Sequence, residues 1–487
     1  MILIGLLLIP LIAVGLIALV RRYAIIEAIH LVAALATLGA GVIAAIEVWQ
    51  TNLSTGFIAA GDGLLRADAL SAFMIMVITV LAAIAAFYAL GYIRAELKSL
   101  PLPRVQLFFA LFHLFIFTML LAVITDNLGV MWVAIEGTTL ATVFLVNFHN
   151  TPTSLEAAYK YLILSSIGIA LAFIGTVLMY YAATAQAGEV AVHWSSLHAA
   201  AASLNPQVVR LAFAFILIGY GTKAGLAPMH TWLPDAHSEA PAPISALMSG
   251  VLLNVGLYAL LRFKAIVDLS VGGDFAATWL MGFGLLSLVV AAIFLLTQRN
   301  YKRMLAYSSV EHMGLICLGL GFGGYWGVLG ALLHVINHAL SKSLLFMLSG
   351  NILLKYHTTD IGQVRGLLRS SPLTGGAFLV GTLALIGLPP FGPFLSEFII
   401  FRAGLAGDTA WVAVAGVGLL VAVFAGMLGS LNAMLYGSAP DHLRPGDALK
   451  WPLLPLSINF VLLLILGLTM PPALVAFLDQ VLKVLGV

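Results

Sequence analysis

The side chains best able to do chemistry are acids, lysines and histidines set within long apolar stretches. Glu136 lies in WVAIEGTTL and Glu311 in SSVEHMGL, each with apolar residues around it. A charged group within hydrocarbon costs about 2.5 to 3.5 kcal/mol on insertion scales, so each acid requires a partner, water or a function. Burial alone keeps a carboxylic acid protonated, whereas a lysine brought nearby favours the anion. The chemistry that these residues offer is reversible proton binding.

A lysine stands where a long apolar run is interrupted. Residues 223–243 read KAGLAPMHTWLPDAHSEAPAP, and four prolines separate the apolar run before them from the next run, which begins at Ile244. Each interior proline removes an N–H group and clashes with the preceding turn, so no unbroken helix crosses this stretch. Broken backbone at membrane depth is tolerated where protein or a watery cavity satisfies the freed groups. Lys223 therefore either faces a hydrated path or extends to the interface from a helix end.

Glu136 and Lys223 together would form a switch, because moving the lysine changes which charge state of the carboxyl group is stable. The alternative is a static buried salt bridge. Lys160, in EAAYKYLILSS, is either a third member of this set or a lysine at the membrane interface.

A row of titratable residues follows further along the chain. His334, His338 and Lys342 are spaced at i, i+4 and i+8, which stacks them on one helix face. Two imidazoles leading to an amine suit a proton wire near neutral pH. The alternative is that these residues hydrogen-bond neighbouring helices together, at about 0.6 kcal/mol each. Histidines on one helix face do not hold a haem from two sides, and the pair alone lacks further metal ligands, so no cofactor or metal is expected.

A second interrupted segment, GLPPFGPFLSEF, covers residues 387–398. Glu397 within it would end the histidine row as a carboxylate, or it would cap the helix that resumes there. With His230 from the first interruption, the candidate proton-translocating residues are Glu136, Lys160, Lys223, His230, Glu311, His334, His338, Lys342 and Glu397.

The elements that carry these residues must be membrane helices. The chain is 62% hydrophobic and 9% charged, against roughly 25% charged residues in soluble domains. We count about fourteen apolar runs of about 20 residues, each long enough to cross a bilayer. The first is read as a retained span and not as a signal peptide. The predicted spans are 2–20, 24–48, 70–92, 105–124, 128–148, 155–182, 208–226, 244–261, 275–297, 304–322, 326–354, 373–401, 411–436 and 453–470.

Several other classes are excluded by composition. The single Cys317 cannot form an internal disulfide, and one cysteine cannot ligate an iron–sulfur cluster or a structural zinc. The sequence contains no basic patch of the kind that binds nucleic acid. Short loops on one side of the predicted spans carry about twice as many basic residues as those on the other, which predicts that both termini lie outside. Residues 472–487 are expected to form an amphipathic helix at that outer surface.

The two interruptions suggest an internal repeat. Gly225-Leu226-Ala227-Pro228 aligns with Gly387-Leu388-Pro389-Pro390, and Glu136 and Glu311 each lie early in the second span of the repeat. Paired discontinuous helices in corresponding halves are typical of the ion path of a transporter. The alternative is the chance similarity of membrane-helix composition.

These segments carry a family resemblance. PMHTWLPDAHSEAPAPISALMSGVLL, YKRMLAYSSVEHMG, HVINHALSKSLLFMLSGN and LPPFGPFLSEF resemble the antiporter-like, proton-conducting subunits of respiratory complex I, Mrp antiporters and membrane-bound nickel–iron hydrogenases. The resemblance covers most of residues 107–436, and WLPDAH is its most specific block. TPTSLEAAYKYLILSSIGI, SSVEHMG and LSGNIL are most similar to the hydrogenase-4 component F branch of group 4 hydrogenases.

The resemblance implies roles for individual residues. Glu136 matches the family's essential glutamate, and Lys223 matches the broken-helix lysine that pairs with it. The row from His334 to Lys342 matches the central polar axis, and Glu397 matches an acidic variant of the outlet residue. Asn254 stands where complex I members usually carry lysine. Because an amide cannot carry a net proton, water or Glu311 would have to bridge the relay there.

The sequence therefore predicts an all-α membrane protein of about fourteen spans, with two inverted five-helix repeats that each contain a discontinuous helix. The predicted segments are 1–104, 105–262 (first repeat), 263–437 (second repeat) and 438–487. The expected function is proton translocation in the cell inner membrane, beside other membrane subunits and, through them, nickel–iron hydrogenase and iron–sulfur subunits. The alternatives are a cation/proton antiporter subunit and a membrane partner of a soluble protein, as in inorganic-carbon uptake.

Overall fold

Long apolar runs fold as helices because a helix satisfies its own backbone hydrogen bonds where water is absent. The computed structural model describes residues 1–51, 56–96, 100–187, 192–441, 443–449 and 453–487. The first elements are α1 (Ile2–Leu19), α2 (Tyr23–Thr51), β1 (Phe57–Ala60), β2 (Leu65–Asp68) and α3 (Ala69–Glu96). The two strands pair antiparallel, with Phe57 opposite Asp68.

The next helices begin at clear sequence signals. The side chains of Asn127 and Asn205 accept hydrogen bonds from backbone N–H groups in the first turns of α5 and α8, as N-cap residues do. The elements are α4 (Leu102–Ile124), α5 (Leu128–Val146), α6 (Pro152–Ala187), α7 (Trp194–Ala199), η1 (Ala201–Ser203) and α8 (Pro206–Ala224).

The first interruption ends α8. Gly225 has a φ of +78°, the left-handed conformation that commonly terminates a helix. The chain then forms η2 (Met229–Thr231) and α9 (Trp232–Glu239) before α10 (Ala242–Leu247), the π-helical turn η3 (Met248–Leu252) and α11 (Leu253–Val271). The predicted break in this stretch is confirmed.

The second interruption has similar geometry. It separates α16 (Pro372–Leu385) from α17 (Gly392–Leu405), and Gly387 within it has a φ of +73°. Each break also contains a cis peptide bond, Ala227–Pro228 and Pro389–Pro390. The remaining elements are α12 (Gly273–Thr297), α13 (Tyr301–Phe322), α14 (Gly324–Tyr356), α15 (Leu367–Ser370), α18 (Ala410–Leu435), α19 (Leu453–Leu468) and α20 (Pro472–Val484).

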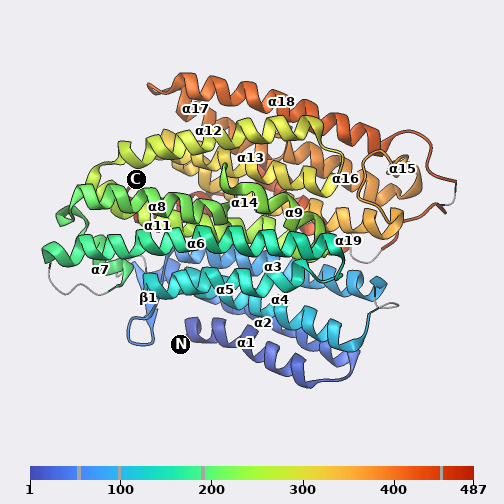
Figure 1. Cartoon of the computed structure of the whole chain (residues 1–487), viewed down its shortest axis with the longest axis horizontal. Helices are drawn as coiled ribbons and strands as arrows, with labels where there is room; N and C mark the ends of the chain where they lie inside the picture. Colours follow the sequence, from blue (N-terminus) through green and yellow to red (C-terminus); the bar gives the residue numbers. More distant parts are fainter. Residues whose placement is uncertain (52–55, 97–99, 188–191, 442, 450–452) are drawn as a thin grey trace.

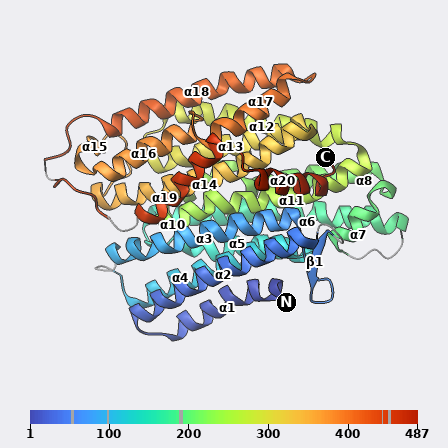
Figure 2. The same ribbon diagram turned by 180° about the vertical axis from the view of Figure 1, so that it is seen from behind.

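The centre of the bundle is formed by α10 with α11, α13 and α14. In both views α14 lies in the middle, with α1 and α18 at opposite edges (Figure 1, Figure 2). The apolar windows of α13 and α14 are each 94% buried, whereas those of α1 and α18 are 28% and 33% buried. Glu311, His312, His334, His338 and Lys342, which lie on α13 and α14, are therefore held in the protein core.

Twelve helices within the described residues are long and apolar enough to cross a membrane, or thirteen if the bent pair α19 and α20 forms one span. A helix occupies each predicted span, but the range 373–401 holds two shorter helices around a break. The number fourteen therefore stays a prediction. The tail does form a helix, α20, which bends by 83° from α19 and packs on α3 and α14.

Candidate functional site

The first polar cluster lies where α5, α6 and α8 meet. Lys223, at the end of α8, is fully buried. Its Nζ donates to Thr139 Oγ1 at 2.7 Å and to Tyr161 OH at 3.2 Å. Gly256 of α11 lets the two backbones approach closely, because a Cβ there would come within 2.8 Å of the Ala224 nitrogen. The lysine is thus fixed by packing and by hydroxyl groups.

Glu136, on α5, lies beside this cluster and is half-buried. Ser166 Oγ donates to Glu136 Oε1 at 2.6 Å, and Thr139 Oγ1 donates to Glu136 Oε2 at 3.3 Å. The predicted Glu136 and Lys223 pair is therefore bridged by the Thr139 hydroxyl. A hydroxyl that accepts from the amine and donates to the carboxylate can pass a proton between them. Sequence reasoning did not identify Thr139, although it follows Glu136 by three residues.

Lys160 lies apart from this buried cluster. Its side chain is 48% exposed and pairs with Glu156 at 2.6 Å and with Asp235 at 3.3 Å. Asp235 also pairs with Arg303 of α13. This geometry fits the interfacial alternative for Lys160.

The second cluster follows α14. His334, His338 and Lys342 are all fully buried on this helix, and the helical spacing places them on one face. Lys342 Nζ donates to the Leu305 carbonyl at 2.9 Å and to the Ser308 hydroxyl, so α13 supplies its partners. Glu311 of α13 is also buried, at 3% exposure.

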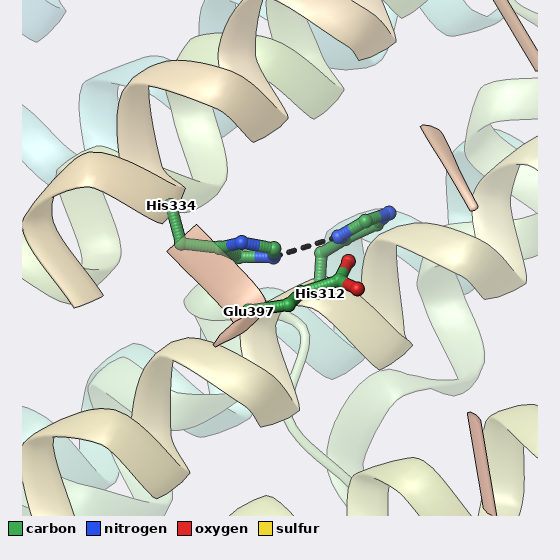
Figure 3. A group of neighbouring side chains, drawn as sticks. All are labelled: His312, His334 and Glu397. Carbon is green, nitrogen blue, oxygen red and sulfur yellow. Dashed lines mark hydrogen bonds between the residues drawn. The ribbon is translucent and has the colours of Figure 1, made fainter. Parts of the chain in front are cut away.

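A histidine that sequence reasoning missed completes this cluster. His312 Nδ1 lies 2.8 Å from His334 Nε2, and its ring centroid lies 5.4 Å from that of His338. Figure 3 shows the carboxylate of Glu397, from α17, beside the two rings, and all three potential ligand atoms lie within 4.8 Å of one another. The signal was present in SSVEHMG, where His312 directly follows Glu311.

Ser396 contacts the ring of His334 on the side away from His312. The Ser396 oxygen lies 2.9 Å from His334 Nδ1 and 3.0 Å from the Pro393 carbonyl oxygen, and it accepts from the Asn337 amide at 3.0 Å. With the hydroxyl hydrogen directed at Pro393, Nδ1 of His334 would carry the proton and Nε2 would present a lone pair. In that tautomer His312 would donate its Nδ1–H to His334 Nε2.

Between the two clusters lies His237 of α9, another residue that sequence reasoning missed. It is fully buried, and neither ring nitrogen has a hydrogen-bond partner among the described residues. Its ring stacks on Phe346 of α14, with centroids 5.2 Å apart, and lies 6.3 Å from the Trp232 ring. Trp232 in turn packs on Tyr161, the partner of Lys223.

Two other positions that the sequence singled out are also buried. The Asn254 amide donates to the Gly250 carbonyl at 2.8 Å, and its carbonyl oxygen has no partner among the described residues. His230 is 5% exposed, and its ring lies 6.2 Å from that of Tyr307. Neither residue hydrogen-bonds a member of the two clusters within the described part of the chain.

A buried ion pair closes one end of the bundle. Arg262 of α11 donates to both carboxylate oxygens of Asp68, at 2.6 and 2.7 Å. Burial raises the pKa of Asp68, but the charge and hydrogen bonds of Arg262 outweigh burial and leave that pKa below its ordinary value. This pair ties β2 to α11.

Comparisons with known proteins all find antiporter-like membrane subunits. The family model described as NADH:quinone oxidoreductase/Mrp antiporter, TM, matches residues 125–423. The hydrogenase-4 component F homolog of Methylacidiphilum infernorum is 40% identical over 399 residues, which cover 81% of this chain and 83% of that protein.

Solved structures share the fold. A chain of the membrane-bound sulfane sulfur reductase (MBS), an archaeal respiratory membrane complex, superposes with a TM-score of 0.88 at 24% identity, covering 99% of this chain and 97% of that one. A chain of the Mrp complex from Dietzia sp. DQ12-45-1b superposes with a TM-score of 0.82 at 21% identity, covering 99% and 95%.

Proposed function

Because the chain belongs to the NADH:quinone oxidoreductase/Mrp antiporter transmembrane family, we propose that it is a proton-translocating membrane subunit of a redox-driven complex of the complex I or group 4 hydrogenase type. The identity to a hydrogenase-4 component F homolog favours the hydrogenase branch. Its partners are then other membrane subunits and, through them, nickel–iron hydrogenase and iron–sulfur subunits. We place it in the cell inner membrane with both termini outside.

The proposed architecture has fourteen spans and two inverted five-helix repeats at 105–262 and 263–437. The pattern of breaks supports the repeats. In the first segment the fourth long helix, α8, is broken from α9, and in the second segment the fourth, α16, is broken from α17. Glu136 and Glu311 lie on the second long helix of each segment, which are α5 and α13.

The proposed route runs from Glu136 through Thr139 to Lys223, across the gap beside His237, and along the α14 row to Glu397. A change at a partner subunit would alter the Glu136 and Lys223 contact and thereby the proton on Lys223. The observation that carries this proposal is the fully buried Lys223, linked to Glu136 through one hydroxyl. Fully buried His237 offers ring nitrogens that can carry a proton, whereas the amide of Asn254 cannot.

The test is proton pumping by the intact complex in proteoliposomes. Lys223→Ala and Glu136→Ala should each abolish pumping while leaving complex assembly intact. Lys160→Ala is the matched control, because this lysine is half exposed and lies outside the buried cluster. Normal pumping by either of the first two variants would refute the assignment.

A cation/proton antiporter subunit is the second candidate, favoured by the structural similarity to a chain of the Mrp complex. It would use the same buried row. Varying sodium in the flux assay separates the two, because only an antiporter would couple proton movement to sodium.

A further inference from the structure

His312, His334 and Glu397 come from three different helices, α13, α14 and α17, and converge in the core. Among the described residues they are the one group of three histidine, cysteine or acidic side chains whose ligand atoms approach closely, all within 4.8 Å (Figure 3). Two imidazole nitrogens and one carboxylate oxygen are a ligand set that zinc accepts with a fourth position open. We propose that these three residues bind a divalent transition metal ion of the zinc class.

The distances require the ligands to move, because ligand atoms now up to 4.8 Å apart would have to approach to about 3.3 Å. Two nitrogen ligands of a tetrahedral zinc ion stand about 3.3 Å apart, whereas His312 Nδ1 and His334 Nε2 are 2.8 Å apart. The two rings would separate by about 0.5 Å, and the ion would take the place of the hydrogen that joins them. Glu397 is half-buried, whereas the two histidines are fully buried, so an ion would have to enter from the side of Glu397.

The protonation of the histidines also fits. Ser396 Oγ lies 2.9 Å from His334 Nδ1 and can accept an N–H from it, and in that tautomer Nε2 presents a lone pair to the site. A hydrogen bond of this kind on the far nitrogen orients metal-binding histidines. To bind the ion through Nδ1, His312 carries its proton on Nε2, which has no hydrogen-bond partner among the described residues. No net proton is lost in that exchange.

The surrounding charges favour a cation. Glu397 supplies one carboxylate, and buried Glu311 precedes His312 in the chain. Lys342 opposes a cation, but its amine is held by Leu305 and Ser308 of α13. Metal binding at this site requires no proton flow along α14, so it is testable apart from the proposed function.

The test uses the full chain, purified in mild detergent without a histidine tag, with Zn²⁺ titrated by calorimetry. We expect one saturable equivalent. His312→Gln and Glu397→Gln should weaken it by more than about 100-fold, and Ser396→Ala, which removes an orienting contact, by roughly 10- to 100-fold. Unchanged Zn²⁺ affinity in both His312→Gln and Glu397→Gln would overturn the site.

A second buried histidine pair provides the matched control. His30 Nδ1 lies 3.0 Å from His113 Nε2, yet no acidic side chain completes a three-ligand group there among the described residues. His113→Gln should leave Zn²⁺ affinity unchanged, and loss of binding in this variant would contradict the proposal.

The visible absorption of bound Co²⁺ can be measured on the unaltered chain, so this test does not require any variant to fold. Co²⁺ should give the intense visible absorption of a tetrahedral ion with nitrogen ligands. The weak spectrum of hexahydrated Co²⁺, or the absence of saturable binding, would overturn the proposal.

Discussion

At the residue scale, the central contact is the hydroxyl of Thr139 between an amine and a carboxylate. It accepts from Lys223 at 2.7 Å and lies 3.3 Å from Glu136. A direct pair would exchange a proton in one step, whereas this arrangement needs the hydroxyl to accept one proton and release another. The side chain at position 139 is therefore expected to control the exchange.

We predict that Thr139→Val lowers proton pumping by at least about 10-fold, because valine keeps the shape but removes the hydroxyl that joins the two charges. Thr139→Ser restores the hydroxyl and should keep most of the pumping. Proteoliposome flux at matched complex content measures both. Equal pumping by the valine and serine variants would mean that water bypasses this position.

The sequence identified these charges but not their partners. Glu136, Lys223 and the α14 row were recognisable because charge within an apolar run is costly. Thr139, His237 and His312 were not, because their importance depends on how neighbouring helices are rotated against one another. Spacing along one helix predicts a shared face but does not predict which residue of another helix meets it.

At the scale of elements, the two broken helices position Lys223, at the end of α8, and Glu397, on α17. The prolines and glycines made both breaks predictable. The backbone conformation within each break was not predictable, because it depends on close packing against neighbouring side chains. At the second break, a Cβ at Gly387 would collide with the carboxylate of Glu397.

Gly387→Ala should therefore destabilise the second break. A non-glycine residue in the left-handed conformation costs roughly 1 to 2 kcal/mol, and the added methyl group would displace Glu397. We expect a lower melting temperature together with weakened pumping. Gly376→Ala in α16 is the matched control, because a Cβ there meets no atom within 4 Å. A Gly387→Ala variant as stable and active as this control would contradict the prediction.

At the scale of the whole molecule, the Asp68 and Arg262 pair joins the N-terminal hairpin to the central helix α11. The side chains are 4% and 6% exposed. Removing one partner from such a pair leaves a buried charge and costs about 3 to 5 kcal/mol. Asp68→Asn should lower the melting temperature far more than Glu27→Gln, which breaks the more exposed Glu27 and Arg94 pair.

The same pair predicts a pH dependence. The pKa of Asp68 is lower in the folded chain than its unfolded value of about 3.9. Its stabilising contribution is therefore complete above that value and is lost as pH falls through the folded pKa. Melting curves between pH 7 and pH 3 should show a drop below about pH 4 that is smaller in Asp68→Asn. An identical drop in both proteins would assign the acid sensitivity to other groups.

The class of fold was predictable from composition, because only helices or closed barrels satisfy a backbone in lipid and long apolar runs select helices. Which helices form the centre was not predictable. The ranges 2–20 and 411–436 are hydrophobic enough to be expected in the core. The helices that they form, α1 and α18, nevertheless lie at the edges of the bundle. The less apolar helices α13 and α14 are the buried ones. Their polar side chains hydrogen-bond one another and are costly to expose to lipid.

The direction of α14 has a consequence for energy coupling. His334 and Lys342 are eight residues apart on one continuous helix, which corresponds to about 12 Å along its axis. Where α14 runs along the normal of a hydrocarbon layer of about 30 Å, that rise crosses roughly two-fifths of the voltage drop of an energised membrane. At about 2.3 kcal/mol per 100 mV for a full crossing, moving one proton along the row exchanges about 0.9 kcal/mol with the electric field. The membrane potential itself would thus bias which end of α14 holds the charge.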